Sequence, residues 1–129
     1  MKILDIIENS ELQPQNLTVE ELFHILLHEL GFSFKIQGTH YLEELFSLAY
    51  EKYESKCDLQ VMELYKEIAT IHNMDIRAVS RSISYCITVA WNKGNVRLQN
   101  ELFGYTLDPD KGKPSPQEFL CLTMDLLKL

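Results

Sequence analysis

The sequence has no apolar run long enough to cross a membrane. A transmembrane helix needs about 18 to 20 consecutive apolar residues, and no stretch of this 129-residue chain approaches that length. Asp5 and Glu8 also interrupt any signal-peptide core at the start of the chain. We therefore expect a cytoplasmic protein without a membrane partner.

Residue patterns typical of metal centres and enzyme active sites are also scarce. The three cysteines, Cys57, Cys86 and Cys121, are far apart and form no C-x-x-C pair, so we expect buried free thiols. His24 and His28 lie four residues apart and could share a metal, but no second ligand pair accompanies them, which favours a helix surface. A Gly-rich phosphate loop and a nucleophile motif are both missing. The sequence predicts no metal site, no cofactor and no enzyme.

Acidic residues are missing from one segment, Ile76 to Asn100, although the chain contains 19 of them. With four basic residues this segment has a formal charge of +4, so the net charge of −7 leaves −11 on the rest. A net negative chain does not coat nucleic acid without regard to sequence, but one acid-free face can meet phosphates. The basic residues of the segment are Arg77, Arg81, Lys93 and Arg97.

Apolar residues recur at helical spacing along the chain, and no segment fits the alternating pattern of a strand better than the helical one. Capping residues and breaks in the pattern mark the helix starts, and Gly31 and Gly94 mark two of the ends. We predict an all-α fold, a compact six-helix domain over residues 18–129 that follows an N-terminal arm, residues 1–17. The residues expected at the helix starts are Thr18, Thr39, Asp58, Asp75, Asn95 and Ser115.

The arm contains an apolar cluster that is seldom left in water. We expect its apolar residues to pack against the domain or against a second copy, which would give a homodimer. The single tryptophan, Trp91, is expected in the core rather than in a base-stacking platform with Tyr105. The apolar residues of the arm are Ile3, Leu4, Ile6 and Ile7.

Residues 68–83 have the spacing of a helix-turn-helix. Ala69 is small where two helices must approach closely, and Asn73 sits in the corner, where its side chain tolerates the left-handed conformation. Asp75 can cap the second helix, which should run for about four turns. At about 100° per residue, one polar face of this helix lies opposite its apolar stripe. That face consists of Arg77, Ser80, Arg81, Ser84, Tyr85 and Thr88.

The residue types on this face suit a recognition helix in the major groove of double-stranded DNA. Arginine can bridge the two acceptors of a guanine edge, and hydroxyls can donate to phosphates or bases. We expect Arg81 to read bases, and Arg77, Lys93 and Arg97 to contact phosphates. Lys111 and Lys113, before the last helix, are further phosphate candidates, assisted by the helix N-terminus. For those two lysines a plain solvated loop is the alternative.

Four motifs give the chain a specific resemblance from about residue 20 to its end. They resemble the C-terminal effector domain of the sporulation initiation response regulator family, stage zero sporulation protein A. The resemblance implies a compact six-helix domain that binds DNA through a helix-turn-helix, often as head-to-tail pairs, and contacts RNA polymerase sigma factor. It also aligns Arg81 with a base-reading arginine. The motifs are His28-Glu29-Leu30-Gly31, Val89-Ala90-Trp91-Asn92-Lys93-Gly94-Asn95, Leu102-Phe103-Gly104-Tyr105-Thr106, and Lys113-Pro114 followed by Phe119.

The chain departs from that family along the expected recognition helix. Ala78, Ser80, Ser84 and Tyr85 stand where the family is expected to have arginine, glutamate, arginine and histidine. The family's DNA sequence preference therefore does not transfer. The arm is also too short for a receiver domain, so control by receiver phosphorylation is not expected. These departures leave an alternative, a protein-interaction module that modulates sigma factor or another regulator without binding DNA.

Overall fold

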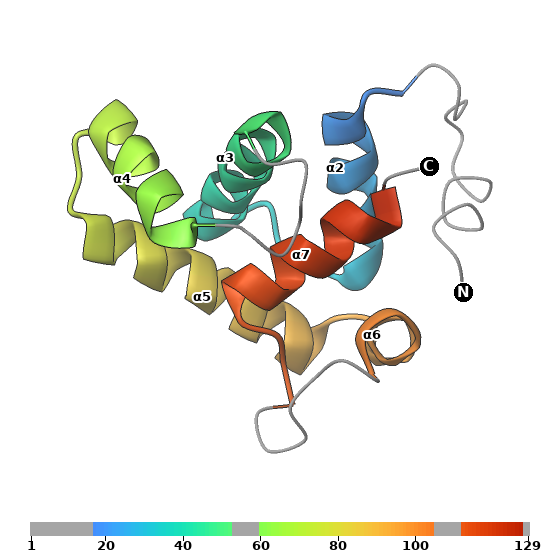
Figure 1. Cartoon of the computed structure of the whole chain (residues 1–129). Helices are drawn as coiled ribbons and strands as arrows, with labels where there is room; N and C mark the ends of the chain where they lie inside the picture. The colour runs from blue at the N-terminus through green and yellow to red at the C-terminus, as the bar shows by residue number, and fades with distance from the viewer. Residues whose placement is uncertain (1–16, 53–59, 105–111, 128–129) are drawn as a thin grey trace.

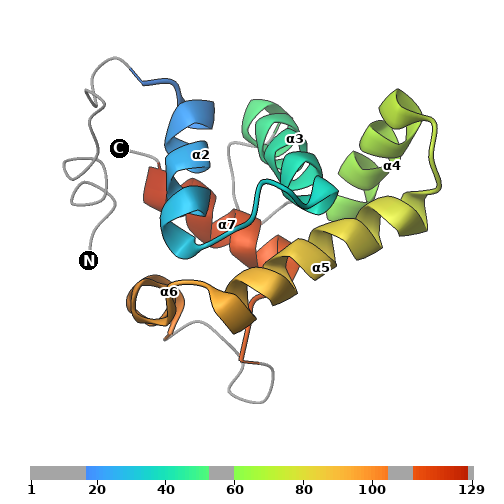
Figure 2. The same ribbon diagram turned by 180° about the vertical axis from the view of Figure 1, so that it is seen from behind.

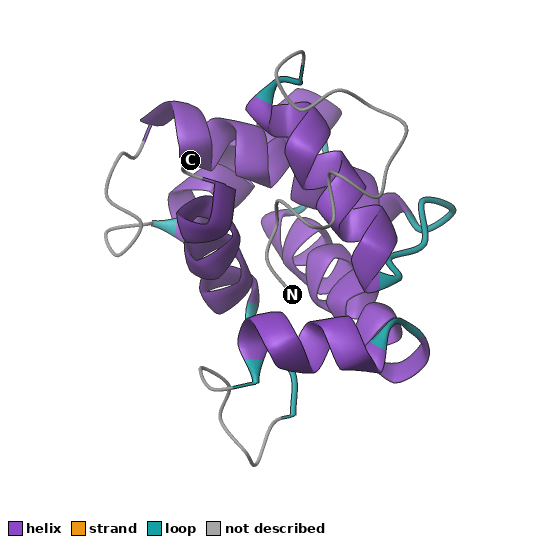
Figure 3. Ribbon diagram, turned by 90° about the vertical axis from the view of Figure 1, so that its right-hand side faces the viewer, coloured by secondary structure: helices purple, strands orange, loops and turns teal. Residues whose placement is uncertain are grey.

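The computed structural model of the chain describes residues 17–52, 60–104 and 112–127, which form six α-helices and no strand. This confirms the all-α fold (Figure 1; Figure 3). None of the described helices is both long and apolar enough to cross a membrane. The helices are α2 (Val19–Leu30), α3 (Gln37–Lys52), α4 (Val61–His72), α5 (Ile76–Lys93), α6 (Val96–Phe103) and α7 (Pro116–Leu127). The predicted arm up to residue 16, Cys57, Asp58, Tyr105 and Lys111 lie outside the described residues.

Capping residues fix the first and last helices where the sequence predicted. Thr18 and Glu21 form a reciprocal capping box at α2, in which each backbone N–H lies 3.1 Å from the other's side-chain oxygen. Ser115 and Glu118 form the same arrangement at α7, with distances of 2.9 and 3.1 Å. Because both boxes involve residues close in sequence, local chemistry is sufficient to set these starts.

The predicted start of the second helix at Thr39 is wrong. The helix α3 begins at Gln37, and Thr39 lies fully buried inside its first turn. Its hydroxyl donates to the Ser33 carbonyl oxygen at 2.7 Å and so fixes the preceding turn from within the helix. Gly38 permits the earlier start, since a Cβ atom there would lie only 1.9 Å from the Ser82 carbonyl oxygen of α5.

The long helix α5 is the central element of the fold. It packs against α3, α4, α6 and α7, and it crosses the molecule below α3 and α4 in Figure 1. The view from behind shows the same crossing (Figure 2). Its 18 residues make about five turns rather than the expected four. One side of α5 therefore packs against the core along the length of the helix.

An aromatic cluster joins α2, α5, α6 and α7. The Phe119 ring is fully buried, with its centroid 5.3 Å from that of Phe32, 5.4 Å from Phe103 and 6.1 Å from both Phe23 and Trp91. Trp91 meets its neighbours edge to face, the arrangement that aromatic rings prefer. Trp91 is partly buried and packs against the core.

Two glycines let the C-terminal ends of α2 and α5 meet. A Cβ atom on Gly31 would lie 2.4 Å from Gly94 Cα, and one on Gly94 would lie 2.4 Å from the Leu30 carbonyl oxygen. The buried Gln99 amide donates to the Leu30 carbonyl at 3.1 Å and to the Ala90 carbonyl at 2.7 Å. Gln99 thereby fixes the short helix α6 to the ends of both longer helices.

The buried thiol of Cys86 gives the first prediction. Burial raises the pKa of Cys86 to about 12. Because the thiolate is the reactive form, we expect Cys86 to resist an aromatic disulfide reagent at about pH 8 in the folded protein and to react after unfolding in urea. Mass spectrometry of peptides from both samples measures this. Equal labelling of Cys86 before and after unfolding would contradict the burial seen here.

Candidate nucleic-acid interface

The corner between α4 and α5 has the geometry of a helix-turn-helix. Asn73 ends α4 in the left-handed conformation, with φ 51° and ψ 54°. The Met74 N–H donates to the Ala69 carbonyl at 2.9 Å, and Ala69 is only 7% exposed. The roles predicted for Ala69 and Asn73 are confirmed. The tight corner holds the start of α5 in a fixed direction relative to α4.

Asp75 caps α5 from the other side of this corner. The Arg77 N–H donates to Asp75 Oδ1 at 2.8 Å, and the Arg77 guanidinium lies 3.5 Å from Oδ2. The hydrogen bond from the Arg77 backbone lowers the pKa of Asp75 below its usual value. A lowered pKa means that the cap is present at neutral pH and is lost only as the pH falls through that lowered value. The helix start is therefore intact under ordinary conditions.

The structure brings the predicted polar residues of α5 together on one face. Val79, Ile83 and Cys86 are buried on the opposite face. At about 100° per residue, the polar residues span a sector of about 140° around the helix axis. The exposed members of this α5 polar face are Arg77, Arg81, Ser84 and Tyr85, and the partly buried members are Ser80 and Thr88.

Met62 of α4 is a neighbour of this face that the sequence reasoning missed. It is 57% exposed and lines a hollow of about 180 Å³ together with Ile76, Arg77, Ser80 and Arg81. The helical spacing of α4 gave no sign of this contact, because Met62 belongs to neither its apolar stripe nor its charged side. An apolar side chain thus borders the two arginines.

Lys113 joins the opposite end of the α5 polar face. Its Nζ atom donates to Thr88 Oγ1 at 2.6 Å. A hollow of about 260 Å³ lies between α5 and the residues before α7, where Ser84 and Lys113 both line it. The sequence named both Lys113 and Thr88, but no pattern connected the two residues. A cation therefore lies beside the C-terminal half of the face.

The N-terminus of α7 has few free donors beside Lys113. The Glu118 N–H already donates to Ser115 Oγ, and Pro116 has no N–H. The Glu118 carboxylate accepts from the Ser115 N–H and so places a negative charge at the same helix end. Geometry therefore favours Lys113, rather than the helix terminus, as the group that an anion would meet.

Lys93 and Arg97 lie apart from the α5 polar face. Lys93 is in the last turn of α5, about 160° around the axis from Arg77. Arg97 belongs to α6, where its side chain is 89% exposed and its Nε lies 3.5 Å from Glu101 Oε1. The structure thus separates the predicted basic residues into a face on α5 and an outlying pair.

One of the two histidines considered as metal ligands, His24, contacts a glutamate instead. His24 and His28 are both exposed, and His24 Nδ1 lies 2.7 Å from Glu43 Oε2 of α3. Among residues 17–52, 60–104 and 112–127, no group of three or more histidine, cysteine or acidic side chains could hold a metal ion. The described residues therefore form no cluster of metal ligands.

Comparison with known families agrees with this arrangement. The family model described as sporulation initiation factor Spo0A C terminal matches residues 23–127. The match runs from α2 to α7 and includes the helix-turn-helix and the whole α5 polar face. It confirms the resemblance seen in the sequence. The chain belongs to the Spo0A C-terminal family, the DNA-binding effector domains of sporulation regulators.

Proposed function

We propose that this domain is a sequence-specific transcription regulator that inserts α5 into the major groove of DNA. The observation that carries the proposal is the acid-free polar face of α5, which exposes Arg77 and Arg81 directly after a tight helix-turn-helix corner. A major groove admits one α-helix, and arginine makes the commonest specific contact in it.

Positions along α5 suggest a role for each cation. Arg77 and the contact between Lys113 and Thr88 lie about 16 Å apart along the axis, which exceeds the groove width of about 12 Å. These two cations therefore suit phosphates on opposite walls of the groove. Arg81 lies between them, where two of its N–H donors can reach N7 and O6 of a guanine. Lys93 and Arg97 are proposed to contact phosphates beyond this segment.

The salt dependence of binding tests the phosphate roles. We expect the logarithm of the affinity to fall with the logarithm of salt concentration with a slope of about −3 to −4, which corresponds to a few phosphate contacts. Replacing Arg77 or Lys113 with Ala should weaken every duplex alike and reduce that slope by about 1. Fluorescence anisotropy on selected and random duplexes measures both effects.

Lys35→Ala is the matched control for those variants. Lys35 is an exposed lysine between α2 and α3, so its loss changes the net charge equally but lies outside the proposed interface. Its slope should match that of the unchanged protein. If Arg77→Ala altered the preferred sequence instead of weakening all duplexes, the assignment of Arg77 to a phosphate would be wrong.

A second candidate function is an interaction module that modulates transcription without binding DNA. The substitutions at Ala78, Ser80, Ser84 and Tyr85, together with the net charge of −7, favour it. Absence of binding to a diverse pool of duplexes at low salt would reject the first function and favour this candidate. Under either function, sigma factor and a second copy of the chain are the partners that the family resemblance suggests.

A further inference from the structure

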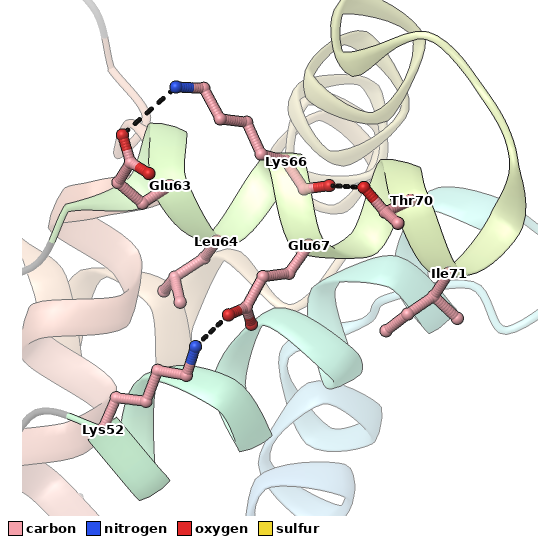
Figure 4. A pocket seen from close by; sticks show the side chains of 7 residues that line it. All are labelled: Lys52, Glu63, Leu64, Lys66, Glu67, Thr70 and Ile71. Carbon is pink, nitrogen blue, oxygen red and sulfur yellow. Dashed lines mark hydrogen bonds and ion pairs between the residues drawn. The ribbon is translucent and has the colours of Figure 1, made fainter.

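A groove runs between α3 and α4. It consists of two hollows, of about 650 and 520 Å³, which meet at Ile71. Figure 4 shows the residues that line the larger hollow, with Leu64 near the pair of Lys52 and Glu67 and with Ile71 farther along α4. The smaller hollow continues along α3 past Leu48.

The floor of this α3–α4 groove is apolar and partly open to water. Ile71 of α4 is 65% exposed and lines both hollows. Leu64 is buried and Leu48 is partly buried against the core, so Ile71 supplies most of the exposed apolar surface of the groove. An exposed isoleucine in the centre of a groove gives an amphipathic helix a place to bury its apolar side.

The rim of the groove is acidic. Four glutamates line it beside two lysines and His40. Two of the glutamates contact the lysines, while Glu43 lies 2.7 Å from His24 and Glu44 lies 2.8 Å from His72. The four carboxylates still outnumber the two lysines. Lys66 Nζ lies 3.2 Å from Glu63 Oε1, and Lys52 bonds Glu67 (Figure 4). A basic partner complements this rim, whereas DNA does not. The arm of this chain does not either, because it has three acidic residues against one lysine. The glutamates are Glu43, Glu44, Glu63 and Glu67.

The groove also lies away from the proposed DNA face. Ile71 and Met62 are nine residues apart on α4, which places them about 180° apart around its axis. Met62 borders Arg77 and Arg81, so Ile71 is on the opposite edge of the helix. An occupant of the groove would therefore leave the α5 polar face accessible.

We propose that the α3–α4 groove docks a short basic amphipathic helix of a partner protein. Apolar side chains of that helix cover Ile71 and Leu48, while flanking lysines or arginines meet the glutamates of the rim. This inference goes beyond the proposed function and does not depend on it. A regulator with such a groove can hold a partner while its recognition helix is in use.

The test uses two synthetic peptides of about 18 residues, a length of about 27 Å that is sufficient to follow α3. Both peptides place leucines at helical spacing on one side. One has lysines on its flanks and the other has glutamates at the same positions. We expect saturable binding of the lysine peptide to the full chain and binding at least about tenfold weaker for the glutamate peptide. Absence of saturable binding, or equal affinity of both peptides, would overturn the proposal.

Variants of α4 locate the binding. Ile71→Gln and Ile71→Lys should each weaken the lysine peptide, the second by at least about tenfold. Met62→Gln and Met62→Lys are matched controls at a similarly exposed apolar residue of the same helix, and the peptide affinity should change by less than about twofold. Unchanged affinity of both Ile71 variants would show that the peptide binds elsewhere and would reject the groove.

Failure of DNA binding is distinguishable from failure of this proposal. Arg81→Ala should leave peptide affinity unchanged, and Ile71→Gln should leave duplex affinity unchanged. Loss of peptide binding in Arg81→Ala would place the peptide on the α5 polar face and overturn the groove assignment. Circular dichroism of each variant checks that its helices remain formed.

Discussion

Replacing Arg81 with Ala is expected to weaken binding to the best duplex by about 1 to 3 kcal/mol, because a two-pronged contact with guanine is lost. The loss on random duplexes should be much smaller. Arg81 is exposed opposite the buried Val79 and Ile83, so thermal stability should change by no more than about 0.5 kcal/mol. Anisotropy on selected and random duplexes, with melting of the free protein, measures the three quantities.

Arg81→Lys is the matched variant for this prediction. Lysine keeps the charge but lacks the planar fork of arginine, so part of the specific affinity should remain lost. Equal losses of Arg81→Ala on selected and random duplexes would show that Arg81 contacts phosphate. A large fall in thermal stability would show that the side chain is structural.

Replacing Phe119 with Ala is expected to lower the free energy of unfolding by about 3 to 5 kcal/mol, as for other buried aromatic residues. Its fully buried ring contacts the other aromatic rings of the cluster that joins α2, α5, α6 and α7. Removing the ring would therefore leave a cavity where these helices meet. Urea unfolding followed by circular dichroism gives the free energy. The fluorescence of Trp91, the only tryptophan, reports the same transition.

Phe119→Leu keeps most of the buried volume and should cost clearly less than Phe119→Ala. A loss below about 1 kcal/mol for Phe119→Ala would mean that neighbouring rings close the cavity and that the cluster does not hold the helices together. Coincident transitions from both probes are required for the free energies to be comparable.

Local chemistry explains why so much of the fold could be predicted from the sequence. Thr18, Asp75 and Ser115 each cap a helix through contacts with residues only two or three positions away. Asn73 adopts its left-handed conformation at the end of α4, where its N–H donates to carbonyls only three and four residues earlier. Such features depend only on neighbours in sequence, so they can be predicted without knowledge of the fold.

Contacts between distant segments account for what the sequence did not show. The early start of α3 depends on Gly38 meeting Ser82, a residue more than forty positions away. Gln99 is a polar residue in a short helix, and its burial follows from carbonyls of Leu30 and Ala90 that no local pattern reveals. The candidate site shows the same limit, since helical spacing grouped the α5 polar face but gave no link to Lys113.

The distribution of charge between the helices has a consequence for how the domain meets DNA. The helices α2, α3 and α4 carry most of the described glutamates, whereas α5 carries arginines without any acid. Such a molecule is an electric dipole, and the field of a duplex exerts a torque on it within about one Debye length, about 10 Å at 0.1 M salt. We expect that torque to turn α5, the proposed recognition helix, toward the duplex before contact. Added salt should therefore slow association more than it hastens dissociation.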